Sequence, residues 1–285
     1  MNAHNSSLLS QPPLVVLLHG LHSSKEELVF IEAGLKRAGI QCCLLEISGY
    51  TINSQAHHLG AVSWHDWLDE LTVKLDKLHQ THGPLILSGI STGANLALAA
   101  SLHTPRLLAG VVPLSTSIFL DGWSVPFYSF LLPLVYYTPL GRLWSYKESP
   151  PYGVKDERIR KWIAHELQTR GASATGSSSI PNEFLRENHR LRIWLKRKLK
   201  QCGKRVPLLA IHAKDDELAS MRNVEFLKSN WSYAFFNQVV LHDSYHMICI
   251  DRERSKVVSA MINFTKKNLL DNSENDEKEK YECHI

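Results

Sequence analysis

The sequence GISTG, residues 89–93, follows the apolar run LeuIleLeu at 85–87 and precedes a stretch of small and apolar residues at 94–100. It has the pattern Gly-x-Ser-x-Gly, between a predicted strand and a predicted helix. In a nucleophile elbow, this pattern places the serine on a sharp turn, and the glycines allow close backbone packing around it. The five residues alone are a weak signal, because a tight turn that merely contains a serine gives the same pattern. Their interpretation depends on the rest of the chain.

Strands and helices alternate around this stretch. Short apolar runs typical of buried strands occur at 14–18, 42–47, 85–88, 107–112, 206–211 and 236–241. Helical patterns lie between them, and the longest has its apolar face on Trp64, Trp67, Leu68, Leu71, Leu75 and Leu78. A last helix is expected over about 253–270. The alternation predicts an α/β fold with a mostly parallel central sheet flanked by helices.

The regular alternation is interrupted between residues 117 and 202. We therefore predict one α/β core from 1–116 and 203–270, with an inserted helical cap at 117–202. The residues 271–285, DNSENDEKEKYECHI, are too polar to form a core, and we predict a disordered tail there.

The predicted cap has an aromatic half and a basic half. Its aromatic residues are Trp123, Phe127, Tyr128, Phe130, Tyr136, Tyr137 and Trp144. They fit the wall of an acyl-chain pocket or a lid that touches lipid, and equally the apolar side of a helical subdomain that packs on the core. The basic stretch Arg186 to Arg205 favours a solvated helix face over contact with anionic lipid headgroups or phosphates.

A serine hydroxyl needs a base, and the base needs an orienting acid. Asp215 and Asp216 follow the predicted strand at 206–211, while His242 and His246 follow the one at 236–241. In a parallel sheet these positions meet at the same edge, in the order Ser, Asp, His. We expect Ser91 to be the nucleophile and His246 the base, with His242 structural.

An oxyanion hole needs two backbone N–H donors. One donor is expected at Thr92, directly after the serine. The other is expected at Leu21, in the loop that follows the first strand, where His19 and Gly20 shape the backbone.

These segments together resemble the α/β-hydrolase superfamily, in particular its small carboxylesterases and monoacylglycerol-lipase-like serine hydrolases. The matching segments are LeuLeuHisGlyLeu at 17–21, GlyIleSerThrGly at 89–93, HisAlaLysAspAspGluLeu at 212–218 and SerTyrHisMetIle at 244–248. The resemblance implies Asp216 rather than Asp215 as the acid, and elbow glycines at Gly89 and Gly93. Tyr245 and Ala94 stand where this branch commonly has glycine, which affects loop shape more than the three catalytic groups.

The resemblance implies a cofactor-free serine hydrolase that cleaves carboxylic esters with an apolar acyl group, with possible peripheral lipid contact through the cap. Acyl transfer or thioester hydrolysis by the same three groups is an alternative, and a non-catalytic ligand-binding protein is a weaker one. We expect no metal site, since His57, His58 and His65 lack ligand-type spacing.

Composition and the N-terminal residues indicate which partners and which cellular compartment to expect. A net charge of +4 over 285 residues gives no case for a nucleic-acid partner. The five cysteines are odd in number and lack metal-ligand spacing, and the N-terminus lacks a basic start and a long apolar core. We therefore expect reduced thiols and a cytoplasmic location.

Overall fold

The computed structural model describes residues 13–52, 63–139, 141, 144–173, 176–201, 206–231 and 236–282. Its centre is a six-stranded parallel sheet in the order β10-β9-β4-β3-β1-β2. The strands are β1 (Leu14–Leu18), β2 (Cys42–Leu45), β3 (Leu85–Ile90), β4 (Leu108–Leu114), β9 (Leu208–Ala213) and β10 (Phe236–Leu241). The predicted α/β-hydrolase architecture is confirmed.

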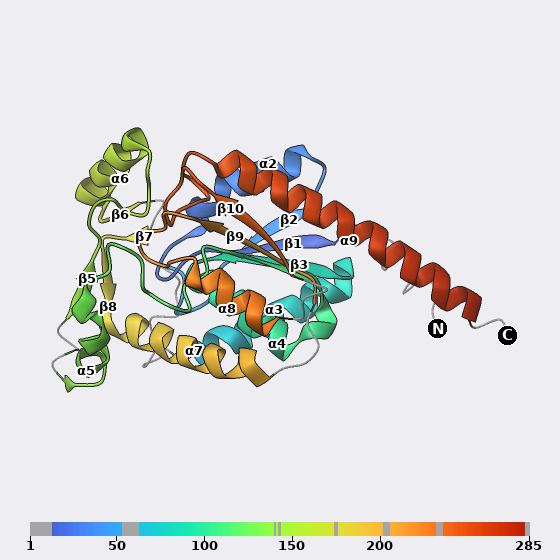
Figure 1. Cartoon of the computed structure of the whole chain (residues 1–285), viewed down its shortest axis with the longest axis horizontal. Coiled ribbons are helices and arrows are strands. Elements are labelled where there is room, and N and C mark those ends of the chain that lie inside the picture. The colour runs from blue at the N-terminus through green and yellow to red at the C-terminus, as the bar shows by residue number, and fades with distance from the viewer. Residues whose placement is uncertain are drawn as a thin grey trace.

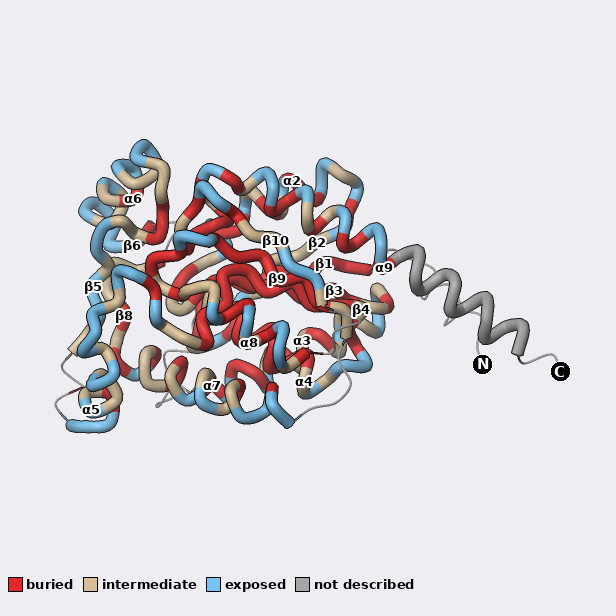
Figure 2. Tube along the Cα trace, in the orientation of Figure 1, coloured by how far each residue is buried: buried red, intermediate tan, exposed pale blue. Residues whose placement is uncertain are grey.

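Helices cover both faces of the sheet, as Figure 1 shows. On one face α2 (Val29–Arg37) packs against α9 (Arg254–Glu282), and Ile31, Leu35, Val257 and Met261 are buried there. The other face carries α3 (Trp64–His82), α4 (Thr92–His103) and α8 (Arg222–Asn230). The sheet is therefore buried between two apolar layers, as Figure 2 shows, which is why its central strands are apolar throughout. Short 3₁₀ helices, η1 (Lys25–Leu28) and η3 (Pro105–Leu107), complete the core.

The last helix is longer than the sequence indicates. We predicted its end at about 270, whereas α9 continues to Glu282. Of the tail predicted to be disordered at 271–285, residues 283–285 lie outside the described residues. The added segment is rich in glutamate and lysine, which have good helix propensity, so a polar segment can extend a helix that already has a buried start.

The segment between β4 and β9 contains strands as well as helices. Its elements are η4 (Phe127–Leu131), α5 (Leu132–Tyr136), β5 (Ser145–Lys147), α6 (Glu157–Arg170), β6 (Ala172–Ser173), β7 (Gly176–Ser177), β8 (Ser179–Pro181) and α7 (Asn182–Gln201). The antiparallel pairs β5–β8 and β6–β7 form two small sheets. Figure 1 shows α5, α6 and these strands at one end of the central sheet. We refer to residues 117–202 as the insert.

Helix α7 leaves the insert and runs along the core. Its residues Leu191, Leu195 and Leu199 are buried in the same apolar cluster as Leu96 of α4. Burial of three leucines stabilises this contact by roughly 5 kcal/mol or more. One side of α7 is therefore fixed to the core, although the helix belongs to the insert. No helix in the described part of the chain is both long and apolar enough to cross a membrane.

Candidate active site

Ser91 occupies the turn between β3 and α4. Its backbone has φ 55° and ψ −116°, a conformation that a residue with a side chain rarely adopts. The turn is held because Ser91 N donates to Leu114 O of the neighbouring strand at 3.0 Å, and Asn95 N donates to Ser91 O at 3.1 Å. The strained conformation and these bonds give the geometry of a nucleophile elbow.

The two glycines of GISTG are required by close backbone contacts. A Cβ on Gly89 would lie 2.4 Å from the carbonyl of Gly93, and a Cβ on Gly93 would lie 2.3 Å from His19 O. Both distances are too short for a side chain. The start of α4 therefore packs directly against the end of β1.

His246 and Asp216 meet beyond the carboxyl ends of β10 and β9. His246 Nδ1 is 2.8 Å from Asp216 Oδ2, and both side chains are buried. Asp216 Oδ1 accepts from Leu218 N at 2.9 Å and from Ala219 N at 2.7 Å. These bonds fix the carboxylate, so the imidazole presents Nε2 on its other side. That atom has no partner within the described part of the chain.

Asp215 has a different environment from its neighbour. Its side chain is 50% exposed and lies 3.4 Å from Lys155 Nζ. It makes no contact with His246 among the described interactions, whereas Asp216 does. His242 is exposed just after the end of β10.

His212 supports the loop that carries Asp216, a role that the sequence analysis did not assign. It lies within β9, where its Nε2 is 2.6 Å from Ala219 O and 3.5 Å from Asp216 Oδ2. Burial lowers the pKa of His212, so the ring is neutral and donates to the Ala219 carbonyl. A histidine inside an apolar strand was the available sequence signal.

Residues 19–21 form the loop that follows strand β1 and belong to the same site. His19 Nε2 is 2.8 Å from Thr51 Oγ1, its Nδ1 is 2.7 Å from Gly20 O, and Tyr50 Oη donates to His19 O at 2.7 Å. Burial lowers the pKa of His19 to about 4, so it is neutral. Its hydrogen bonds shape the loop that carries Leu21.

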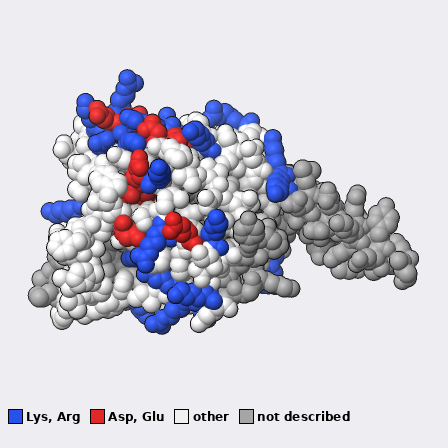
Figure 3. Space-filling view, viewed as in Figure 1, with Lys and Arg blue, Asp and Glu red and all other residues white. Residues whose placement is uncertain are grey.

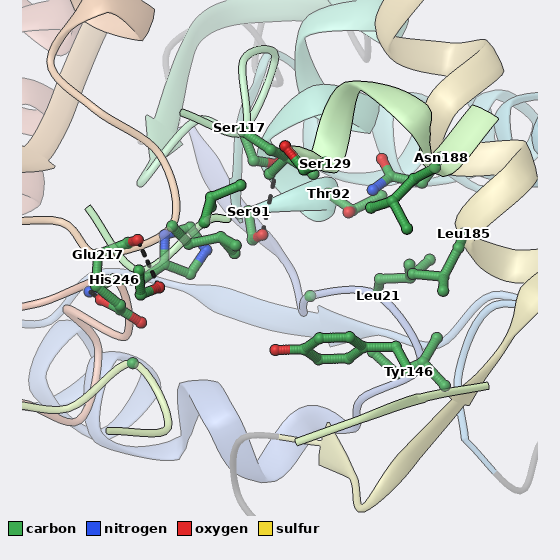
Figure 4. Close-up of a pocket in the computed structure, with 18 of the residues that line it drawn as sticks. Leu21, Ser91, Thr92, Ser117, Ser129, Tyr146, Leu185, Asn188, Glu217 and His246 are labelled. Carbon is green, nitrogen blue, oxygen red and sulfur yellow. Dashed lines mark hydrogen bonds between the residues drawn. The ribbon is translucent and has the colours of Figure 1, made fainter. Parts of the chain in front are cut away.

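Ser91, Thr92, His246 and Leu21 line one cavity of about 560 Å³. Figure 4 shows Ser91 and His246 in this cavity together with Leu185 and Asn188 of α7. Ser91 Oγ is 3.5 Å from Ser117 Oγ, which also accepts from Asn95 Nδ2 at 3.2 Å. The serine hydroxyl therefore opens into an enclosed space that contains the imidazole.

Comparisons with known proteins identify the family and the fold of this chain. The family model described as serine aminopeptidase, S33, matches residues 11–253. The chain belongs to this family. Its α/β-hydrolase fold also occurs in solved structures of low sequence identity, three of which are described next. No curated protein sequence matches this S33-family chain.

The fold matches several lipolytic enzymes. A structure described with LipS and LipT, two metagenome-derived lipolytic enzymes, is 18% identical, with a TM-score of 0.72 over 90% of this chain and 94% of that one. The monoacylglycerol lipase of Paleococcus ferrophilus is 17% identical, with a TM-score of 0.69 over 90% and 96%. A soluble variant of monoglyceride lipase from Saccharomyces cerevisiae, in complex with a substrate analog, is 14% identical, with a TM-score of 0.73 over 90% and 87%. The predicted resemblance is confirmed at the level of family and fold.

Glu27 is part of the cavity wall of this S33-family hydrolase, which the sequence did not indicate. Ser24 Oγ accepts from Glu26 N, whereas the Glu27 side chain turns inward and its carboxylate accepts from Gly20 N at 2.6 Å. Burial raises the pKa of Glu27 to about 8, since charging a buried carboxyl is unfavourable.

Two further carboxyl groups lie near His246. Glu217 Oε2 accepts from His246 N at 3.0 Å, and burial raises the pKa of Glu217. Burial and the proximity of Glu217 raise the pKa of Glu148 to about 7. Burial lowers the pKa of His246, but Asp216, with Glu217 and Glu27, outweighs this and raises it to about 9. The surroundings thus favour the imidazolium form.

The aromatic residues of the insert divide into two sets. Phe130, Tyr136 and Trp144 line the cavity. Trp123, Phe127, Tyr128 and Tyr137 are exposed, and Phe130 is itself 72% exposed. Neither a pocket wall nor simple packing accounts for the whole group.

Metal binding has no support among the described residues, where no group of three or more His, Cys, Asp or Glu side chains is arranged to hold an ion. His65 is exposed in this part of the chain, while His57 and His58 lie outside the described residues.

Proposed function

We propose that this protein is a serine hydrolase that cleaves carboxylic esters through an acyl-enzyme intermediate. Ser91 is the nucleophile, His246 the general base and Asp216 the orienting acid. The observation that carries the proposal is the unpartnered Nε2 of His246, which shares a cavity with the strained Ser91 while Nδ1 is bound to Asp216. Membership of the S33 family and the lipolytic relatives of the fold support it.

The proposed reaction begins when Ser91 Oγ attacks the ester carbonyl and His246 Nε2 accepts the hydroxyl proton. A rotation about the Cα–Cβ bond of Ser91 moves its hydroxyl from Ser117 toward the imidazole. The imidazolium is stabilised by Asp216 and then donates its proton to the leaving alcohol. Water, activated by the same ring, releases the acid from Ser91.

The negative charge on the carbonyl oxygen needs donors in place before the reaction. We propose the N–H groups of Leu21 and Thr92. Thr92 is the first residue of α4, so its N–H has no acceptor within the helix and the positive end of the helix dipole is next to it. Leu21 follows the Gly20 backbone that Glu27 holds.

The lining of the cavity favours an apolar acyl group. Leu132, Pro133, Ile180 and Leu185 of the insert line it together with Met247. An acyl chain would bury these apolar surfaces at about 25 cal/mol per Å². We therefore propose esters of medium or long acyl chains, as in simple carboxylic esters or monoacylglycerols.

Exposed apolar side chains of the insert support a second part of the proposal, which is peripheral contact with lipid. Phe127 is 89% exposed and Leu134 67%, and both are close in sequence to the cavity-lining Phe130 and Pro133. Large exposed apolar side chains, next in sequence to residues that line a cavity, fit an interaction site.

The proposal is tested with a fluorophosphonate probe, which reacts covalently with an activated serine. We expect labelling at Ser91 in the folded protein and hydrolysis of a 4-nitrophenyl ester, both lost in Ser91→Ala. Ser129→Ala is the matched control, because Ser129 lines the same cavity but has no contact with His246 among the described residues. Labelling of another residue, or none in the folded protein, would contradict the proposal.

A further inference from the structure

Helix α7 turns one side of its basic stretch into the cavity. Leu185, Asn188, His189, Arg192 and Lys196 recur at helical spacing and all line the cavity. The leucines on the other side of the helix pack on the core. Arg192 and Lys196, which belong to the basic stretch expected to form a solvated face, are partly buried and line the cavity.

Arg192 lacks the carboxylate partner that other arginines of the helix have. Arg186 and Arg190 both pair with Glu187, at 3.3 and 3.1 Å. Arg192 Nε instead donates to Ile118 O at 2.9 Å, and no ion pair involves Arg192 or Lys196 in the described part of the chain. Burial lowers the pKa of Arg192 to about 10, and this effect outweighs the opposing influence of the nearby Asp121 carboxylate.

Two more cations stand beside Arg192. Lys196 Nζ lies 4.5 Å from the centre of the Phe119 ring, and the guanidinium carbon of Arg222 lies 4.2 Å from it. Asp121 is the acidic residue at this end, and it is 3.5 Å from Arg222. Figure 3 shows that Lys and Arg side chains also gather on the surface over α7. This end of the cavity therefore has an excess of positive charge.

A polar group without a partner is directed into the same space. Asn188 is only 7% exposed and lines the cavity, and its Oδ1 has no partner in the described part of the chain. Figure 4 shows its amide on the cavity side of α7. Buried polar groups normally have hydrogen-bond partners, so this oxygen is available to accept from a donor of the ligand, such as a hydroxyl.

The cationic end is separate from the carboxyl groups around His246. Glu27 and Glu148 are at the His246 end, and burial raises their pKa values to about 8 and about 7. The cations Arg192 and Lys196, which have no ion pair in the described part of the chain, favour an anion at the α7 end.

We propose that Arg192, with Lys196 and Arg222, forms an anion subsite, and that the ester substrate carries a carboxylate or phosphate group there. This rests on the proposed esterase function and adds a substrate class to it. We name carboxylate and phosphate because arginine binds both of these anions through two parallel N–H donors.

The spacing limits the size of such a substrate. Ser117 Oγ is 3.5 Å from Ser91 Oγ, and the next residue, Ile118, supplies the carbonyl bound by Arg192. Together with the bond geometry of Ser117 and Ile118, these distances place Arg192 Nε no more than about 15 Å from Ser91 Oγ. The anionic group therefore lies within the reach of one acyl chain from the ester carbonyl.

The experiment compares matched esters in the full-length protein. The carboxylate arm uses the 4-nitrophenyl monoester of adipic acid against 4-nitrophenyl hexanoate. The phosphate arm uses butyrylglycerol phosphate against butyrylglycerol. We expect a kcat/KM preference for the anionic ester of about 10- to 100-fold in at least one arm, and that arm identifies the group.

Arg192→Met should remove this preference and leave kcat/KM for the neutral ester within about threefold. Arg197→Met is the matched control, since Arg197 is exposed on the same helix and does not line the cavity. Arg192→Lys keeps the charge and should retain part of the preference. This result would show that Arg192→Met loses the preference through the lost charge and not through misfolding. Equal kcat/KM for both members of each pair in the wild type, or an equal loss for both in Arg192→Met, overturns the subsite.

A binding measurement separates failure of the subsite from failure of the esterase proposal. Adipate and glycerol 3-phosphate are titrated calorimetrically into Ser91→Ala and into Ser91→Ala/Arg192→Met. Binding of either anion that depends on Arg192 supports the subsite even if no ester is cleaved. Absence of binding to Ser91→Ala contradicts the subsite, whatever the fluorophosphonate probe shows.

Discussion

Asp216 Oδ2 lies 2.8 Å from His246 Nδ1, while Asp215, one residue earlier, points to Lys155. The two neighbouring carboxylates thus have different environments. Asp216 is buried and bound to the imidazole, whereas Asp215 is exposed and forms a surface ion pair. The proposed roles of the two residues differ accordingly.

Asp216→Asn should lower kcat by about 10⁴-fold, because an amide in place of the carboxylate favours the wrong imidazole tautomer. Asp215→Asn removes only an exposed ion pair and should change kcat by less than about twofold. Steady-state hydrolysis of a 4-nitrophenyl ester measures both. If the Asp215 variant were the more damaged one, our choice of acid would be wrong.

The pKa of His246 gives a pH prediction. Only the neutral imidazole accepts a proton, and the pKa of His246 is raised to about 9. We therefore expect kcat/KM to increase with pH until about pH 9, instead of levelling off near pH 7 as for an ordinary histidine.

Glu217 contributes to this rise in pKa. Glu217→Gln keeps an acceptor for His246 N but removes negative charge, so the pH at half-maximal kcat/KM should fall. Glu225→Gln, at an exposed position of α8, should leave the profile unchanged. A shift to higher pH in the Glu217 variant would contradict this electrostatic account.

Glu27 predicts a pH dependence of stability. Its pKa in the folded protein is about 8, above the ordinary 4.5, so the folded state holds this proton more tightly than the unfolded state. The stabilisation is complete below about pH 4.5 and is lost as the pH rises through about 8. Glu27→Gln cannot ionise, and it should flatten the fall in melting temperature between pH 5 and 8.

We expect the wild type to lose a few kcal/mol of unfolding free energy through the ionisation of Glu27, since one pKa unit is 1.36 kcal/mol. Glu26→Gln, at the exposed neighbouring position, is the control and should follow the wild-type curve. Identical slopes for the Glu27 variant and the wild type would show that Glu27 is charged throughout this range.

Lipid contact is tested at the exposed apolar residues. Phe127→Ser with Leu134→Ser should weaken sedimentation with phosphatidylcholine vesicles by about 10-fold or more, because each side chain contributes roughly 1.5 kcal/mol when buried. Neither residue lines the cavity, so hydrolysis of a water-soluble ester should be unaffected. Val73→Ser, also exposed but on α3, should bind vesicles as the wild type does. Equal binding by all three proteins would rule out this surface.

The core could be predicted because its signals are local. The strands at 14–18 and 236–241 have the predicted bounds, and GISTG gives the turn at Ser91 directly. The position of His246 also followed from local patterns, since it lies in the loop after a recognisable strand. Parallel strand order then brought these loops to one edge.

The contacts of Glu27 and Arg192 could not be predicted in this way. Glu27 lies in a helical turn with ordinary polar spacing, and only folding directs it to Gly20. Arg192 lies in a basic stretch whose two sides have different neighbours, the core and the cavity. Periodicity indicates which residues share a side of α7 but not what that side faces.

The attachment of α7 to α4 through Leu191, Leu195 and Leu199 has a consequence for the evolution of specificity. The wall that carries Arg192 is anchored by the folded core, while few of the described residues between 127 and 147, at the far end of the insert, have buried side chains. Sequence drift in that outer part can alter acyl-chain preference without displacing the charged wall. Selection can therefore change recognition of the proposed acyl chain and of the proposed anionic group separately.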